Sequence, residues 1–351
     1  MLMADALAAP TAMTASAANP VEPIDSHLSQ HMRVPTIHSL HKPIRRVLRI
    51  VSGSDEFYGT TSRYAQFDGD AASDIMNAAI SSKAPFMAAR FGSVEMECIA
   101  GYLNPPCLRN TVKLLRGEIA HFGWKRELFT AMETNAGFFP SDPDNLSRFS
   151  QLMLTDLREL DILGSWLSQE AFVSNLFPAA KKIRLRMMEP YWSSKPWSKQ
   201  LKNKKVLVVH PFEATIRYQY SRREKLFHNS DILPEFDLQI IRAVQSIGGN
   251  RGDFDTWFDA LEYLKSEIAK RDFEIAVLGC GAYGFPLAAH IKRMGKQSVH
   301  MGGAVQLLFG IKGARWESMP THAALFNEHW IRPLPADVPE NFRKVEGGCY
   351  W

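Results

Sequence analysis

Short, almost wholly apolar runs alternate along this chain with longer segments in which apolar residues recur every three or four positions. The short runs predict buried β-strands, because a strand covered on both faces needs no polar alternation. They lie at 85–91, 182–188, 206–209, 238–244, 273–278 and 297–300. The longer segments predict helices. They lie at 70–82, 93–102, 110–134, 146–177, 254–271, 286–294 and 303–309.

Strands that alternate with helices predict βαβ units and a mainly parallel sheet covered by helices on both faces. We therefore expect an α/β, Rossmann-like fold. No internal repeat or long linker interrupts the chain after residue 50, which favours one domain. We expect residues 1–45 to form a flexible tail, because they are rich in Ala, Ser, Thr and Pro, and residues 46–351 to form a single α/β domain.

The charge balance is close to neutral for a chain of this length. Lys and Arg number 41 and Asp and Glu number 37, a surplus of four that does not argue for nucleic-acid binding. The basic stretch that ends the tail, from His41 to Arg49, either touches anionic lipid at the inner membrane or is the solvated side of the first ordered segment. Four scattered cysteines without zinc-type spacing favour the reducing cytoplasm.

The strongest candidate for ligand binding is a Gly-x-Gly-x-x-Gly turn between the strand 273–278 and the helix 286–294. Glycines admit a ligand close to the backbone, and free N–H groups with the helix dipole favour an anion such as a pyrophosphate. The residues predicted to bind it are Gly279, Gly281, Tyr283 and Gly284. The alternative is a tight turn that needs glycine for steric reasons alone. No acidic residue follows the next strand, which disfavours a dinucleotide.

Two other strand ends carry similar chemistry. After the strand 297–300 come Gly303 and Gln306, and then Lys312 and Arg315 beside an indole, which suit a diphosphate and a stacked base. An ordinary basic surface loop is the alternative.

After the strand 85–91, Arg90, Gly92, Ser93 and Glu95 form a strand–turn–helix junction with Ser93 as the helix N-cap. Glu95 suits a divalent cation or a general base, unless it simply pairs with Arg90.

Two further segments offer weaker candidates. His210 ends the strand 206–209 and suits proton transfer or phosphate binding, or else caps the strand. The helix after it carries Arg217 and Tyr220, which either grip an anionic acceptor or form a solvated face. In the loop 135–143, Asn135 beside the aromatic ring of Phe138 suits the face of a sugar, although packing of Phe138 in the core is the common alternative.

Several runs of the chain resemble a known family. ARFGSVE resembles the RFGDGE-like segment of bacterial GT-D-type glycosyltransferases. NAGFFP, VHPFEATIRYQY, LGCGAYGFPLAAHIKRMGK, GGAVQLLFGIKGARW and VEGGCYW are similar to a bacterial group encoded among surface-polysaccharide genes. The resemblance spans about residues 85–351. It implies a GT-D-like single domain, a nucleotide-sugar donor such as UDP-glucose, and a divalent cation at an Asp-x-Glu motif.

Carried onto this chain, the resemblance implies a glycosyltransferase that acts on a glycan or lipid-linked acceptor. Glu95 takes the glutamate position of the motif, as metal ligand for Mn²⁺ or Mg²⁺ or as general base, with His210 as reserve base. Ser93 replaces the family aspartate, and serine is a poor cation ligand. Two other classes stay open: a nucleotide-dependent oxidoreductase or methyltransferase, and a non-catalytic nucleotide- or glycan-binding partner in polysaccharide assembly.

Overall fold

The computed structural model describes residues 66–116, 118–119 and 121–351. The predicted flexible tail, residues 1–45, and residues 46–65 of the predicted domain lie outside the described part. Among the helices of that part, none combines the length and the hydrophobicity that crossing a bilayer requires.

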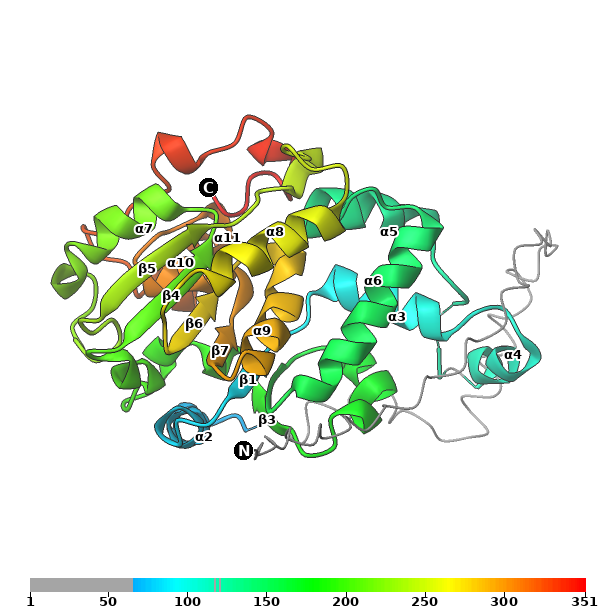
Figure 1. The fold of residues 1–351 in the computed structure, drawn as a ribbon, viewed down its shortest axis with the longest axis horizontal. Helices are drawn as coiled ribbons and strands as arrows, with labels where there is room; N and C mark the ends of the chain where they lie inside the picture. Colours follow the sequence, from blue (N-terminus) through cyan, green and yellow to red (C-terminus); the bar gives the residue numbers. More distant parts are fainter. Residues whose placement is uncertain (1–65, 117, 120) are drawn as a thin grey trace, which may run out of the picture.

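A seven-stranded sheet runs through the middle of the described residues (Figure 1). Its strands, in the order β3-β2-β1-β7-β6-β4-β5, all pair in parallel. They are β1 (Phe86–Ala89), β2 (Ile162–Ser165), β3 (Lys181–Arg184), β4 (Lys205–His210), β5 (Asp237–Arg242), β6 (Ile275–Leu278) and β7 (Gln297–His300). The prediction of an α/β, Rossmann-like fold is confirmed.

The strand order reverses between β6 and β4. The chain moves outward from β1 through β2 to β3, crosses to β4 and β5 on the other side, and returns through β6 to β7, which pairs with β1. Connections that leave neighbouring strands in opposite directions open a crevice above the carboxyl ends of those strands. The chain leaves β4 towards β5 and leaves the neighbouring β6 in the opposite direction, towards β7, so the topology places the crevice over β4 and β6.

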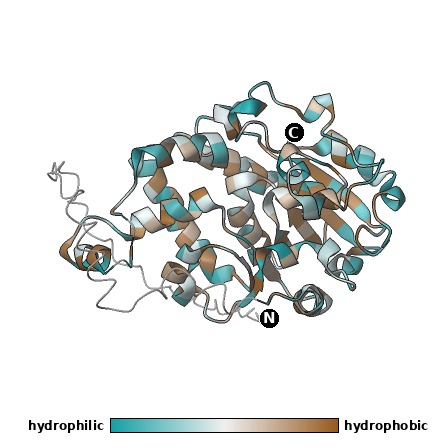
Figure 2. Cartoon of the chain, turned by 180° about the vertical axis from the view of Figure 1, so that it is seen from behind, coloured by the Kyte–Doolittle hydropathy of each residue, from teal (hydrophilic) through white to brown (hydrophobic). Residues whose placement is uncertain are grey.

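Helices cover both faces, and each face has its own hydrophobic core. Side chains alternate along β1, so that Met87 and Ala89 join one core and Phe86 and Ala88 join the other. The first core is covered by α3 (Ser93–Leu103), α6 (Pro143–Asp156), α8 (Trp257–Ala269) and α9 (Gly284–Arg293). The second is covered by α2 (Gly69–Ser81), α7 (Glu213–Tyr220) and α10 (Val305–Leu308). Figure 2 shows the hydrophobic colouring concentrated on the sheet between the more hydrophilic surroundings.

The remaining helices are short and lie at the margins. They are α4 (Leu108–Leu115), α5 (Arg126–Ala131), α11 (Ala314–Glu317) and α12 (Pro320–Ala323). The six predicted strands are confirmed, with ends displaced by a few residues. The predicted helix 110–134 is divided into α4 and α5, and Ser93 is the first helical residue while Gly92 occupies the N-cap position.

The strand β2 lies within a segment, 146–177, that the sequence assigned to helices. That assignment is wrong for Ile162–Ser165, whereas α6 before the strand and a 3-10 helix over Ser168–Leu176 after it are helical as predicted. All four residues of β2 are buried, and four buried residues show no period that separates a strand from a helix.

The last residue of α6 is a buried carboxylate that faces α9. Asp156 accepts a 2.8 Å hydrogen bond from Arg293 through one oxygen, while its other oxygen has no partner among the described residues. Burial raises the pKa of Asp156 from its ordinary 3.8 to about 6, against the opposing effect of Arg293. The folded protein therefore keeps this proton at a pH at which the unfolded chain has released it.

We expect this carboxylate to cost stability at neutral pH. The cost is absent below about pH 4, grows as pH rises through the interval from 3.8 to 6, and is complete above it, on the order of 2–3 kcal/mol. Asp156→Asn should therefore gain stability relative to the wild type as pH rises from 4 to 7, measured by urea unfolding. A difference between the two proteins that is independent of pH would contradict the assignment.

Candidate functional site

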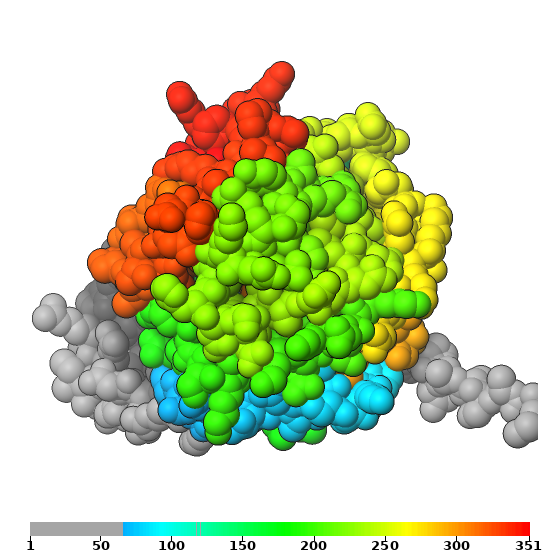
Figure 3. Space-filling view, turned by 90° about the vertical axis from the view of Figure 1, so that its left-hand side faces the viewer, coloured from blue at the N-terminus to red at the C-terminus, as the bar shows by residue number. Residues whose placement is uncertain are grey.

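A cavity of about 410 Å³ opens at the carboxyl edge of the sheet. Segments that follow six of the seven strands line it, together with the end of the chain, from Glu346 to Trp351. Its volume lies within the range of about 300–1,000 Å³ that is usual for small-molecule sites. In Figure 3 the red end of the chain lies at the top of the molecule, on the side opposite α2, which is blue.

Most of the residues predicted from the sequence as a site meet in this cavity. They are Arg90, Gly92, Ser93, Glu95, Asn135, His210, Gly279, Gly281, Tyr283, Gly303, Gln306 and Arg315. They come from stretches as far apart as β1 and α11, and the parallel sheet brings them together. That they share one cavity is a finding; that each contacts a ligand stays a prediction.

Arg90 directly follows β1 and lines the cavity. Its guanidinium lies over the ring of Trp166, 5.1 Å from the ring centroid. Its Nε is buried and has no hydrogen-bond partner among the described residues. Burial lowers the pKa of Arg90, and the charge of Glu95 opposes that shift. A buried donor without a partner carries a free-energy cost that an anionic ligand would relieve.

Glu95 lies in the first turn of α3 and folds back over the turn before it. A Cβ atom on Gly92 would lie 1.7 Å from Oε2 of Glu95, so a side chain at this position would displace the carboxylate from its present place. Burial raises the pKa of Glu95, and Arg90 opposes this rise. The carboxylate of the neighbouring Glu97 lies 3.8 Å from Nε2 of His121, and Glu97 does not line the cavity.

Two buried histidines end β4 and β7, on either side of β6, and both rings line the cavity. Nδ1 of His210 accepts a 3.0 Å hydrogen bond from the N–H of Phe212, and burial lowers the pKa of His210 to about 3. The neutral ring therefore carries its proton on Nε2 and is a donor. This geometry does not suit the reserve-base role predicted for His210.

His300 holds the opposite tautomer. Its Nδ1 lies 3.2 Å from the carbonyl oxygen of Leu278, which can only accept, so Nδ1 donates and Nε2 is the acceptor. Burial and the charge of Arg90 lower the pKa of His300 to about 3. His300 is absent from the site residues predicted from the sequence. It ends a strand, which is the same feature from which His210 was predicted.

The glycine turn after β6 is shaped by these rings. A Cβ atom on Gly279 would lie 2.7 Å from Cδ2 of His210, and one on Gly284 would lie 2.1 Å from Cε1 of His300. Gly284 is not among the residues that line the cavity, and its predicted ligand contact stays a prediction. Gly281 has a φ of +58°, in the left-handed region that favours glycine, and does line it.

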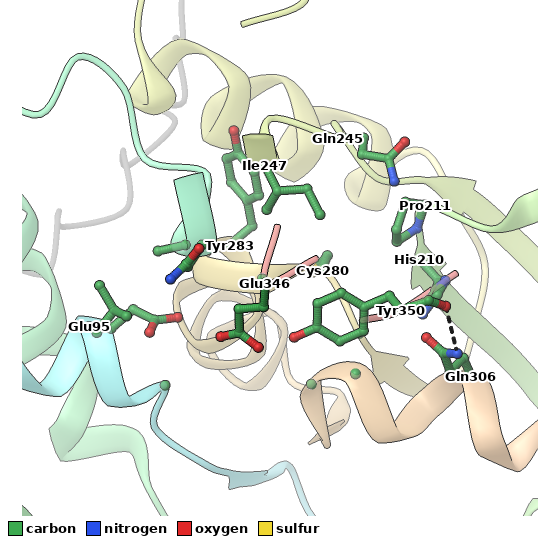
Figure 4. A pocket seen from close by; sticks show the side chains of 18 of the residues that line it. Glu95, His210, Pro211, Gln245, Ile247, Cys280, Tyr283, Gln306, Glu346 and Tyr350 are labelled. Atoms are coloured by element: carbon green, nitrogen blue, oxygen red, sulfur yellow. Dashed lines mark hydrogen bonds between the residues drawn. The ribbon is translucent and has the colours of Figure 1, made fainter. Parts of the chain in front are cut away.

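The wall opposite Glu95 is the end of the chain. The ring of Tyr350 lies against Gly303, where a Cβ atom would be 2.6 Å from Cε1, and Gln306 donates a 3.2 Å hydrogen bond to the carbonyl oxygen of Tyr350. Arg315 forms an ion pair with Glu346 and donates to the hydroxyl of Tyr350 at 3.3 Å. In Figure 4 the carboxyl groups of Glu95 and Glu346 and the hydroxyl of Tyr350 point into the same space.

Side chains of the Tyr283 region complete the cavity floor. Tyr283 stacks on Trp257 with ring centroids 5.0 Å apart, and its hydroxyl lies 2.9 Å from Oγ of Ser246. Gln245 lies in the segment after β5 and lines the cavity. Its Nε2 is buried and has no hydrogen-bond partner among the described residues. Gln245 and Trp166 were not predicted as site residues, because neither belongs to a recognisable sequence motif.

The predicted acceptor residues, apart from Asn135, lie elsewhere. Phe138 is fully buried in the core against Phe149 and Trp257, so its predicted contact with a sugar is wrong. Arg217 pairs with Glu213 at 2.8 Å and borders a separate hollow beside β5. Tyr220 donates to the carbonyl oxygen of Phe236 at 2.8 Å, away from the cavity.

Lys312, predicted to bind the donor, is likewise not among the residues that line the cavity.

The donor set does not fit a divalent cation. The two carboxylates of the cavity each lie beside an arginine, Glu95 beside Arg90 and Glu346 beside Arg315, and position 93 is serine. No three His, Cys, Asp or Glu side chains come together as a metal site in the residues that the structure describes. Hard divalent cations need several oxygen ligands, so we derive no step through a metal.

No protein-family model, curated protein or solved structure matches this chain.

We expect both histidines to stay neutral from pH 8 to pH 4, in opposite tautomers, because burial lowers both pKa values to about 3. Nitrogen-15 NMR distinguishes the two ring nitrogens directly. His210 should show a protonated Nε2 and His300 a protonated Nδ1. Titration of either ring near pH 6.5 would contradict the geometry.

Proposed function

We propose that this protein is a glycosyltransferase that moves a sugar from a nucleotide-sugar donor, UDP-linked by the family resemblance, to a glycan or lipid-linked acceptor. The observation that carries the proposal is the Arg90 guanidinium, whose buried Nε lacks a hydrogen-bond partner among the described residues, in the same cavity as the partly buried carboxyl group of Glu95. Such a transfer needs a cation that stabilises the departing diphosphate and a carboxylate that accepts the proton of the acceptor hydroxyl.

The donor half of the cavity supports binding of a diphosphate. Arg90 and Arg315 lie close enough for each charge to affect the other, and both line the cavity. Nε2–H of His210 adds a neutral donor at the end of β4. As the bond between the anomeric carbon and the phosphate oxygen breaks, negative charge grows on the departing nucleoside diphosphate, and these fixed donors stabilise it.

The acceptor half is centred on Glu95. Burial raises the pKa of this carboxyl group, which brings a weak base closer to working pH, while Arg90 keeps the ionised form accessible. In the proposed step Glu95 takes the proton of an acceptor hydroxyl. The hydroxyl oxygen forms the new bond to the anomeric carbon, and the nucleoside diphosphate leaves with the electron pair of the old bond.

The direct test is calorimetric binding of the common nucleotide-sugars to the wild type, followed by measurement of donor hydrolysis and transfer. Binding of at least one UDP-sugar with turnover is expected. Absence of binding across the whole series would remove the proposal, and binding of NAD(P) or S-adenosylmethionine instead would favour the cofactor-dependent enzymes.

Two substitutions should separate the roles of Arg90 and Glu95. Glu95→Gln should lower kcat by roughly 10²–10⁴-fold with little change in the Kd for UDP, because it removes a base. Arg90→Gln should weaken UDP binding by roughly 10–100-fold, because it removes charged hydrogen bonds.

Glu97→Gln is the matched control for these two variants. It lies on the same helix but outside the cavity, and should change neither kcat nor Kd. Equal loss of folding stability and activity in Glu95→Gln would show a structural role instead.

Turnover should also persist in excess EDTA, since arginines occupy the place of charge neutralisation and the side chains of the cavity do not form a cation site. The measurement is the initial rate with EDTA against the rate with added Mn²⁺ or Mg²⁺. A rate that falls to background and returns with Mn²⁺ would overturn the fit argument.

A further inference from the structure

We propose that Glu346 is an internal anion, which a phosphate group of the ligand displaces from Arg315. The inference deepens the proposed function, on whose phosphate-bearing donor it rests. It assigns to the end of the chain a role in admitting that ligand.

The first step is the charge balance of the cavity. Its charged side chains are two arginines, Arg90 and Arg315, and two glutamates, Glu95 and Glu346. Both histidines are neutral at physiological pH, so they add no charge. A diphosphate entering this balanced cavity would bring negative charge next to two carboxylates, and in a partly desolvated site that repulsion is strong. One carboxylate must leave for the arginines to serve the ligand.

The second step identifies which carboxylate leaves. Glu95 is partly buried and lies against Gly92 at the start of α3. Glu346 is 49% exposed and pairs with Arg315 at the rim. An exposed ion pair contributes little to stability, so the side chain of Glu346 can exchange Arg315 for water at low cost.

The third step is the backbone that holds Glu346 in place. Glu346 has a φ of +45°, and the two glycines after it have φ values of +71° and +89°. The left-handed region is unfavourable for a residue with a Cβ atom, whereas glycine adopts it freely. Release of the carboxylate from Arg315 would leave this turn free to relax towards a less strained backbone conformation.

Release of Glu346 also affects the wall behind it. A smaller cavity of about 150 Å³ shares Arg90, Gly303, Arg315 and Tyr350 with the main one. Arg315 holds the Tyr350 hydroxyl as well as Glu346, so an anion that recruits Arg315 loosens both attachments. We therefore expect phosphate binding to loosen the turn 346–348 and the residues that follow it.

The experiment uses inorganic pyrophosphate as the probe and calorimetry as the readout. Glu346→Gln should bind pyrophosphate roughly threefold to tenfold more tightly than the wild type, because the competing carboxylate is gone. Arg315→Gln should bind it more weakly. Glu317→Gln is the matched control: Glu317 forms an equivalent ion pair with Arg332 and does not line the cavity, so its affinity should equal that of the wild type.

Hydrogen exchange separates displacement from a simple change in local charge. In the wild type, the amides of Gly348 and Trp351 donate to main-chain carbonyls within the segment, and pyrophosphate should speed their exchange. Unchanged or slower exchange overturns the displacement. So does a pyrophosphate affinity in Glu346→Gln that equals or falls below that of the wild type, including the case in which neither protein binds.

The outcome for this inference is distinguishable from that for the proposed function. Tighter pyrophosphate binding by Glu346→Gln, with faster exchange but no turnover of any nucleotide-sugar, would leave the displacement standing and remove the transferase. Turnover of a UDP-sugar by the wild type, with unchanged pyrophosphate affinity in Glu346→Gln, would do the reverse.

Discussion

The parallel direction of the strands is the constraint on which the rest of the site depends. Because the strands β1 to β7 all run the same way, their carboxyl ends meet at one edge of the sheet. Peptide segments far apart in sequence then deliver side chains to a single volume. Arg90, His210 and His300 are each at or just after the end of a strand, and no local motif connects them. The cavity therefore arises from the strand topology, because no single segment supplies all of its lining residues.

Desolvation then determines what these side chains can do. The same burial holds two imidazoles neutral, raises the pKa of Glu95 and leaves the Nε of Arg90 without a partner among the described residues. Neutral rings with fixed tautomers cannot share the charge of a ligand, so that task falls to the arginines. In the proposed function, the roles of the arginines and of Glu95 follow from which groups remain charged after burial.

Sequence patterns predicted the fold well wherever a strand was followed by a glycine turn, as at β6 and β7. They failed at β2, which is too short to show a period, and at Phe138, because an aromatic residue in a loop looks the same whether it faces solvent or a core. The rule that ligands bind at the carboxyl ends of parallel strands predicted Arg90, Glu95 and His210 as site residues. It could not find Trp166 or the contact between Arg315 and Glu346, since those depend on packing between distant segments.

The glycines of the Gly-x-Gly-x-x-Gly turn after β6 lie against side chains of the protein itself. Two of its three glycines are required by imidazole rings of the protein itself, Gly279 by His210 and Gly284 by His300. A glycine signature that is usually taken to report a phosphate can therefore be maintained by an internal side chain. Positions 284 and 300 form a coupled pair, in which a larger residue at the first is compatible only with a smaller one at the second.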